Sequence, residues 1–148
     1  MKLLVKNRRA TFDYEITERL VAGLELTGSE VKSIKAGHAS LKGSFVALRD
    51  SEAYLSNAHV TPYKHTGNKE EIDPLRNRKL LLHRKQLDKL IIDKQSGLSV
   101  VATALLLEHN LVKLEIGIGR GKKQYDKRNA IKERDVTREL AADFKHKQ

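Results

Sequence analysis

The chain has 148 residues, which fits one domain with an appended segment, and it carries a formal net charge of +10. It contains no cysteine, so disulfide bonds and thiolate metal sites are excluded, and a reducing cytoplasm is compatible with the composition. No apolar run approaches the roughly 20 residues that cross a bilayer, and residues 1–6 are too short for a signal peptide. The positive charge predicts a polyanionic partner rather than a membrane, since a membrane surface would require a basic helix with a strong apolar face.

The N-terminal part of the chain is predicted to form one strand and one short helix. Residues 6–9 are basic and polar and are expected to be loose. Apolar residues at positions 14 and 16, and later at 24 and 26, keep a spacing of two, which predicts a strand with one wet face, and Gly23 predicts a bulge or bend in it. Thr27 and Glu30 fit a capping box, which predicts a short helix that ends at Gly37.

Two hairpins and a second helix are predicted next. Residues 45–49 and 53–60 have the composition of strands joined by a turn at 50–52. Residues 61–77 form a polar loop, and a loop of this length is often functional. Apolar residues at helical spacing predict a helix over 83–95, with Gly97 past its end. Residues 98–107 and 111–118 are predicted to be strands joined by a turn at 108–110. In the second strand, apolar residues at 112, 114, 116 and 118 share one face, and charged residues at 113 and 115 lie on the other.

The order of these elements favours a mainly β protein with short helices. Because helices do not alternate with strands, we expect a small closed β-barrel of the oligonucleotide-binding type, although a β-sandwich also fits the pattern. We assign residues 1–119 to this barrel and residues 120–148 to a basic tail. The tail contains ten Lys and Arg and five Asp and Glu. Its net charge is therefore 10 − 5 = +5, which is half of the +10 of the whole chain. Its apolar face is thin, so we expect it to be disordered when free and helical when bound.

The junction between barrel and tail has the composition of an RNA-binding segment. Residues 119–128 contain five cations, one anion and the ring of Tyr125. Cations suit phosphates and a flat ring suits an unpaired base. A solvated linker explains the same composition equally well.

The chain shows no pattern of a catalytic or metal site. The six histidines are scattered, the carboxylates are interleaved with cations, and the glycines at 117–121 do not match a nucleotide-binding loop. We therefore predict that the protein is not an enzyme and uses neither a cofactor nor a metal ion.

Several short motifs occur in a specific order along nearly the whole chain. They are Asn7-Arg8, Tyr14, Ala22-Gly23, Gly28 with residues 30–33, Ala36-Gly37, Asp73-Pro74 with Arg76, residues 78–82, Gly121-Lys122-Lys123 and Asp126-Lys127-Arg128. Each motif is weak by itself, but the set in this order resembles the SsrA-binding protein family, also called small protein B, the partner of transfer-messenger RNA in bacteria.

The resemblance implies RNA binding without catalysis. The barrel would bind the tRNA-like domain of transfer-messenger RNA, and the tail would occupy the decoding centre and mRNA channel of a stalled ribosome, against 16S rRNA. The RNA would reach the empty A site with elongation factor Tu and GTP, so that trans-translation tags the nascent chain and rescues the ribosome in the cytoplasm. A structural rRNA-binding protein of the ribosome and a nuclease on the same fold are the alternatives.

Carried over position by position, the resemblance implies two sets of site residues. Those near transfer-messenger RNA are Asn7, Tyr14, Lys79, Leu81 and Lys113. Those at the ribosome are Lys122, Lys123, Tyr125, Asp126, Lys127 and Arg128. The lysines suit phosphates and Tyr14 suits stacking or a sugar hydrogen bond. Tyr14 also fits a half-buried strand residue, Leu81 a core residue, and Glu30 a structural role in its capping box.

Two positions depart from the family pattern. The family commonly has Glu before Ala-Gly, where this chain has Val21, so no RNA contact is carried over to that position. The family often has His before Asp126, where this chain has Tyr125. Either ring can stack on an exposed rRNA base, so that role is retained without a titratable proton.

Overall fold

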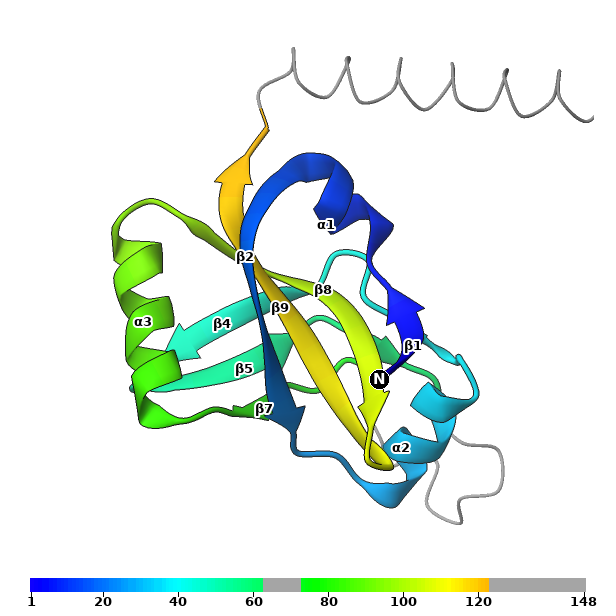
Figure 1. The fold of residues 1–148 in the computed structure, drawn as a ribbon. Helices are drawn as coiled ribbons and strands as arrows, with labels where there is room; N and C mark the ends of the chain where they lie inside the picture. The colour runs from blue at the N-terminus through cyan, green and yellow to red at the C-terminus, as the bar shows by residue number, and fades with distance from the viewer. Residues whose placement is uncertain (63–72, 123–148) are drawn as a thin grey trace, which may run out of the picture.

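A computed structural model describes residues 1–62 and 73–122 of the chain (Figure 1). Strands dominate it, and the prediction of a mainly β protein with short helices is confirmed. The elements in chain order are β1 (Lys2–Lys6), α1 (Arg8–Asp13), β2 (Tyr14–Leu24), α2 (Gly28–Lys35), β3 (Ala39–Ser40), β4 (Phe45–Arg49), β5 (Glu52–Ser56), β6 (His59–Val60), β7 (Arg78–Leu81), α3 (Arg84–Gln95), β8 (Ser99–Glu108) and β9 (Leu111–Gly121). No helix in the described ranges is long and apolar enough to cross a membrane.

Seven strands form one antiparallel sheet in the order β1-β8-β9-β2-β7-β5-β4, and β3 pairs with β6 in a small second sheet. Within the described residues, the edge strands β1 and β4 do not pair with each other, so the sheet curls but stays open (Figure 1). The prediction of a closed barrel is therefore wrong. The chain leaves β1 at Asn7, whose side chain donates to the Leu41 and Ala102 carbonyls. One side chain thus links β8 to the segment between β3 and β4.

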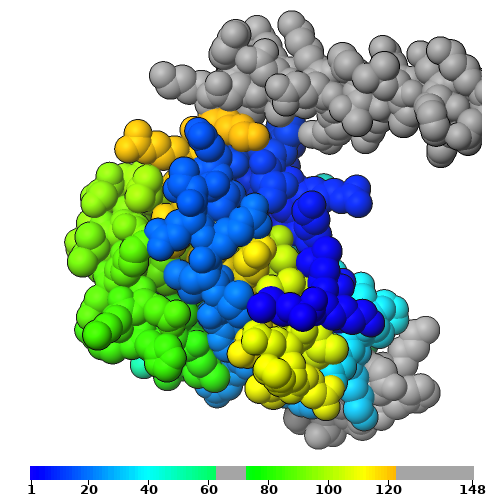
Figure 2. All heavy atoms as spheres, in the orientation of Figure 1, coloured from blue at the N-terminus to red at the C-terminus, as the bar shows by residue number. Residues whose placement is uncertain are grey.

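One apolar core fills the concave side of the sheet. In β9 the residues Val112, Leu114, Ile116 and Ile118 are buried, whereas the charged residues between them face outward, as their alternation predicts. Leu90 of α3 and Ile34 of α2 are also fully buried against this core. Each such side chain contributes about 1.5–3 kcal/mol by leaving water. In Figure 2 the green surface of α3 adjoins the blue surface of β2.

The predicted local signals are confirmed at the short helix and the turns. The Thr27 hydroxyl accepts from the Glu30 amide at 3.2 Å, and the Thr27 amide donates to the Glu30 carboxylate at 2.9 Å, which completes the capping box. Asp50 and Ser51 have positive φ values of 50° and 59°, as two-residue hairpin turns require. The turn is one residue shorter than predicted, so Glu52 is the first residue of β5.

Of the two alternatives predicted for Gly23, the bulge is wrong, and the bend stays a prediction. The register of β2 against β9 shifts between Ile16 and Glu18, and it is regular at Gly23. Gly23 instead pairs with Lys113 of β9 and with Leu81 of β7. A Cβ atom at Gly23 would lie 3.1 Å from the Leu81 Cβ, so glycine serves here to let β7 approach closely.

The N-terminal segment is not loose as predicted. Lys2–Lys6 is a strand that pairs with β8, and residues 8–13 form α1. Asn7 lies between them, 7% exposed, and its Oδ1 accepts from the Ala10 amide at 3.3 Å. Its backbone amide donates to the Thr103 carbonyl at 2.8 Å. One buried polar residue therefore anchors a segment whose composition is that of a solvated loop.

Candidate nucleic-acid interface

Three strands bring three of the five predicted RNA-binding residues together on the outer face of the sheet. Lys113 of β9, Gly23 of β2 and Leu81 of β7 are direct cross-strand neighbours, and such neighbours share a face. Because Gly23 has no side chain, the Leu81 side chain can lie close against its backbone. Leu81 is 53% exposed, which excludes the alternative that it belongs to the core. The row thus places one apolar and one cationic side chain on neighbouring positions of the outer face.

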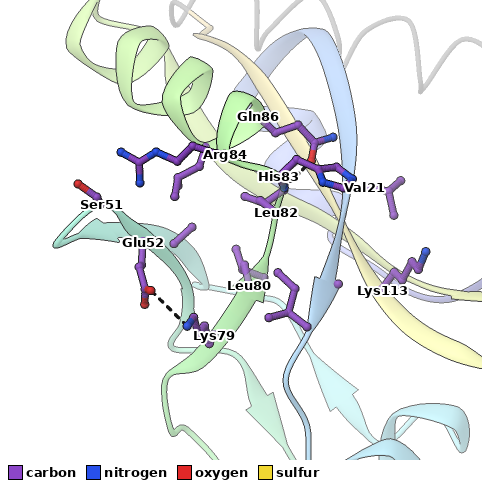
Figure 3. A pocket seen from close by; sticks show the side chains of 14 residues that line it. Val21, Ser51, Glu52, Lys79, Leu80, Leu82, His83, Arg84, Gln86 and Lys113 are labelled. Atoms are coloured by element: carbon purple, nitrogen blue, oxygen red, sulfur yellow. Dashed lines mark hydrogen bonds and ion pairs between the residues drawn. The ribbon is translucent and has the colours of Figure 1, made fainter.

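An open pocket of about 620 Å³ adjoins this row, between β5, β7, β2 and the first turn of α3 (Figure 3). Its charged lining residues are Lys79, Arg84, Lys113 and Glu52, and its apolar lining includes Val21, Leu81 and Leu82. Lys79 and Lys113 stand on opposite sides of it in Figure 3. The excess of cations suits a phosphate backbone, and the apolar lining suits a base or a ribose.

Each of the two predicted lysines faces a carboxylate. Lys79 Nζ lies 3.2 Å from Glu52 Oε1, and Lys113 Nζ lies 3.5 Å from Glu108 Oε2. The hydrogen bond from Lys79, followed by one from the Tyr54 hydroxyl, lowers the pKa of the Glu52 carboxyl. The same bond to Glu52 raises the pKa of Lys79. Both members of this pair are therefore charged at neutral pH.

The next residue inward on β7 belongs to a buried ion cluster. Arg78 and Glu30 are 1% and 2% exposed, and Arg78 Nε lies 2.6 Å from Glu30 Oε2. Arg76 Nε also donates to that oxygen at 3.0 Å, and the other Glu30 oxygen accepts from Arg76 and from the Thr27 amide. Arg78 further donates to the Ala58 and Pro74 carbonyls at 2.9 and 3.1 Å. The cluster ties β7 to α2 and to the chain on both sides of residues 63–72.

The surroundings of Glu30 stabilise its charged form. Burial alone would raise the pKa of this carboxyl, but the hydrogen bonds from Arg76, the Thr27 amide and Arg78 outweigh burial and lower the pKa to about 2. The structural role predicted for Glu30 is confirmed, and it is wider than a capping box. Arg76 and Arg78 occur in the sequence motifs, but nothing in their local spacing identifies Glu30 as their partner.

The two remaining barrel residues lie elsewhere. Asn7 uses both its amide group and its Oδ1 within the protein, so the structure gives it an anchoring role. Tyr14 is half-buried and pairs with Gly121 at the far end of β2 from Gly23. Both residues line a second cavity of about 380 Å³, with Arg9, Phe45 and others. The structure thus gathers Lys79, Leu81 and Lys113 in one place and separates Asn7 and Tyr14 from them.

Of the six residues predicted to bind the ribosome, Lys122 alone falls within the described ranges. Strand β9 continues to Gly121, two residues past the predicted domain boundary. The Lys122 amide donates to the Asp13 carbonyl at 2.8 Å, and its Nζ donates to the Thr11 carbonyl at 3.4 Å. The predictions for Lys123, Tyr125, Asp126, Lys127 and Arg128 lie outside the described residues. The division at residue 119 stays a prediction.

The fold and this site define a small, mainly β protein with an open, curled sheet and a cation-rich outer pocket suited to a polyanion. The family model described as SmpB protein matches residues 4–146, and the chain belongs to this family. The resemblance inferred from the motifs is confirmed.

Relatives and a solved structure agree over nearly the full length. An SsrA-binding protein of Synechococcus sp. (strain JA-3-3Ab) is 49% identical over 98% of this chain and 95% of its own length. One of Bacillus pumilus (strain SAFR-032) is 48% identical over 99% and 94%. A chain from the structure described as "tmRNA-SmpB: a journey to the center of the bacterial ribosome" is 40% identical, with a TM-score of 0.67, over 86% of this chain and 93% of that one.

Proposed function

We propose that the protein binds the tRNA-like domain of transfer-messenger RNA and delivers it to the empty A site of stalled ribosomes for trans-translation. One observation carries the proposal: Lys79, Leu81 and Lys113, which come from two distant parts of the chain, line one outer pocket. Relatives named SsrA-binding protein and a structure described by tmRNA, SmpB and the ribosome support it. Elongation factor Tu with GTP would accompany the RNA, in the cytoplasm.

The pocket can hold a folded RNA by two kinds of contact. Lys79 and Lys113 neutralise phosphates on opposite sides of it, and Leu81 packs against a ribose or base between them. Val21 lines the same pocket where the family commonly has Glu, so this chain offers the RNA an apolar contact at that position. This arrangement requires neither a cofactor nor a catalytic group.

The C-terminal residues supply the second half of the proposal. Residues 120–148 would act as a ribosome-binding tail, disordered when free and helical in the complex, with Lys122, Lys123, Tyr125, Asp126, Lys127 and Arg128 at the decoding centre and mRNA channel. Their charge suits 16S rRNA, and Tyr125 suits stacking on an exposed base. The bonds of Lys122 to residues 11 and 13 support a fixed starting point for this tail.

Truncation of the chain tests the role of the tail separately from that of the pocket. A chain that ends at Lys122 keeps every residue of β9 and of the pocket. We expect it to bind the tRNA-like RNA with nearly full affinity and to lose tagging of nascent chains on stalled ribosomes. Normal tagging by the truncated chain would contradict the role of the tail.

RNA recovered with the full chain tests the partner directly. Affinity purification from cells followed by sequencing should yield one dominant tRNA-like species, with the protein enriched on stalled ribosomes. Stoichiometric presence on all translating ribosomes, with rRNA as the main RNA, would instead identify a structural ribosomal protein. Cleavage of the bound RNA on addition of a divalent metal would identify a nuclease.

A further inference from the structure

Lys79 and Glu52 form an ion pair that is accessible to a ligand. Their side chains are 40% and 41% exposed, they line the pocket from neighbouring strands, and they point toward each other (Figure 3). Lys79 therefore does not meet a phosphate as an isolated cation, because a carboxylate stands 3.2 Å from its Nζ.

The position of Glu52 is fixed by its neighbours. Its Oε2 accepts from the Tyr54 hydroxyl at 3.1 Å, and Tyr54 is the direct cross-strand partner of Lys79. The guanidinium of Arg49, which pairs with Glu52 in the hairpin, lies 5.3 Å from the centre of the Tyr54 ring. The carboxylate is thus held at the pocket by two paired strands, and not by a mobile loop.

A fixed carboxylate beside a lysine discriminates between ligands. An RNA segment that presents only phosphates gains attraction from Lys79 and loses part of it to repulsion by Glu52. A segment that presents a phosphate together with an N–H or O–H donor satisfies both side chains at once. In folded RNA such donors are the ribose 2′-hydroxyl and the imino or amino groups of exposed guanine.

We propose that Glu52 is a specificity-determining residue of this pocket, which accepts a hydrogen bond from the bound RNA and weakens the binding of a nucleic-acid backbone that offers phosphates alone. The proposal rests on the proposed function, since it concerns how the same pocket chooses its RNA. The same carboxylate repels a ligand that presents only phosphates and accepts a hydrogen bond from a ligand that also presents a donor.

The variant Glu52→Gln removes the charge while keeping the size and an acceptor for the Tyr54 hydroxyl. Dissociation constants are measured over a range of salt for a tRNA-like-domain transcript and for an abasic deoxyribose-phosphate oligomer of equal length, which has neither a base nor a 2′-hydroxyl. We expect tighter binding of the abasic oligomer, with a salt slope steeper by about 0.7 as Lys79 becomes available. The preference for the tRNA-like RNA should fall about tenfold.

Two comparisons isolate the effect. Glu18→Gln removes the same charge from an ion pair with Lys89 that does not line the pocket, and it should leave the preference unchanged. In a Lys79→Gln background, Glu52→Gln should tighten binding of the abasic oligomer less than in the wild type, because only the repulsion by Glu52 is relieved and no cation is liberated. Substituting 2′-deoxynucleotides or inosine in the transcript identifies which donor Glu52 accepts.

An equal change of both affinities in Glu52→Gln, or no change, would overturn the role of Glu52 while leaving the proposed function intact. A wild-type protein without preference for the tRNA-like RNA would overturn the proposed function and this inference with it. Thermal unfolding of each variant shows whether it is folded under the conditions of binding.

Discussion

Arg78 and Lys79 are consecutive residues of β7, each paired with a glutamate, and they lie in opposite environments. The Arg78–Glu30 pair is 1% and 2% exposed, whereas the Lys79–Glu52 pair is 40% and 41% exposed. In the interior, a charge that loses its partner cannot be hydrated, so the inner pair is obligatory. On the outer face water competes for both charges, so a group of the ligand can replace either member of the pair as the partner of the other. Burial, not residue type, separates a structural pair from one available for binding.

The two pairs are mechanically linked through the strand they share. Arg78 fixes β7 by its bonds to Glu30, to Ala58 and to Pro74. Because Lys79 is the next residue, the inner cluster also sets where the outer lysine stands. A structural substitution behind the strand is therefore expected to change RNA binding in front of it.

The largest effect should follow from breaking the inner pair. Glu30→Gln leaves Arg78 buried without its counter-charge, and we expect a loss of about 3–5 kcal/mol in the free energy of unfolding. Urea denaturation at neutral pH measures this loss. Glu52→Gln is the matched change on the outer face and should leave the urea midpoint nearly unmoved. Equal stability of the two variants would refute the comparison.

Acid should reproduce that loss in the wild-type protein. The folded pKa of Glu30, about 2, lies below its ordinary value of 4.5, so its contribution is fully present above pH 4.5 and is lost as the pH falls toward 2. The shift corresponds to about 3 kcal/mol. Unfolding free energies measured between pH 6 and pH 2 should fall less steeply in Glu30→Gln than in the wild type. Parallel curves would show that another group controls acid stability.

Removing a cation from the outer face should weaken RNA binding without affecting the fold. Lys79→Ala or Lys113→Ala is expected to reduce affinity for the tRNA-like RNA about three- to tenfold and to lower the salt slope by about 0.7–0.9. Lys89→Ala removes the same charge on α3, outside the pocket lining, and serves as the control. Binding titrations at several salt concentrations measure both quantities. A comparable loss with Lys89→Ala would indicate a diffuse charge effect.

The smallest effect concerns the close packing of Leu81 against Gly23. A Cβ atom in Gly23→Ala would lie 3.1 Å from the Leu81 Cβ and would push that side chain aside. We expect about a threefold loss of RNA affinity and a cost of about 1 kcal/mol in stability. Gly28→Ala, where a Cβ meets nothing within 4 Å, should leave RNA affinity unchanged. Unaltered RNA binding by Gly23→Ala would show that this close packing has no role in binding RNA.

The parts of the fold that depend on residues close together in the sequence could be predicted. The capping box of Thr27 and Glu30 acts over three positions, and the alternation in β9 acts over two, so both are visible in the sequence. Parts that join distant segments were missed or wrong. Asn7 has the composition of a loop, yet it is buried by partners at positions 41 and 102. The open sheet likewise depends on how the edge strands meet.

The sequence by itself determined the mainly β character, the positive charge, the family motifs and the identity of Lys79, Leu81 and Lys113 as candidate site residues. Only the tertiary structure decided that these three line one pocket, that Asn7 and Tyr14 lie apart from it, that Glu30 neutralises Arg76 and Arg78, and that Glu52 stands beside Lys79. The physical reason is that charge and periodicity are properties of the chain. Burial and partnership depend instead on strand register, which places residues from distant positions side by side.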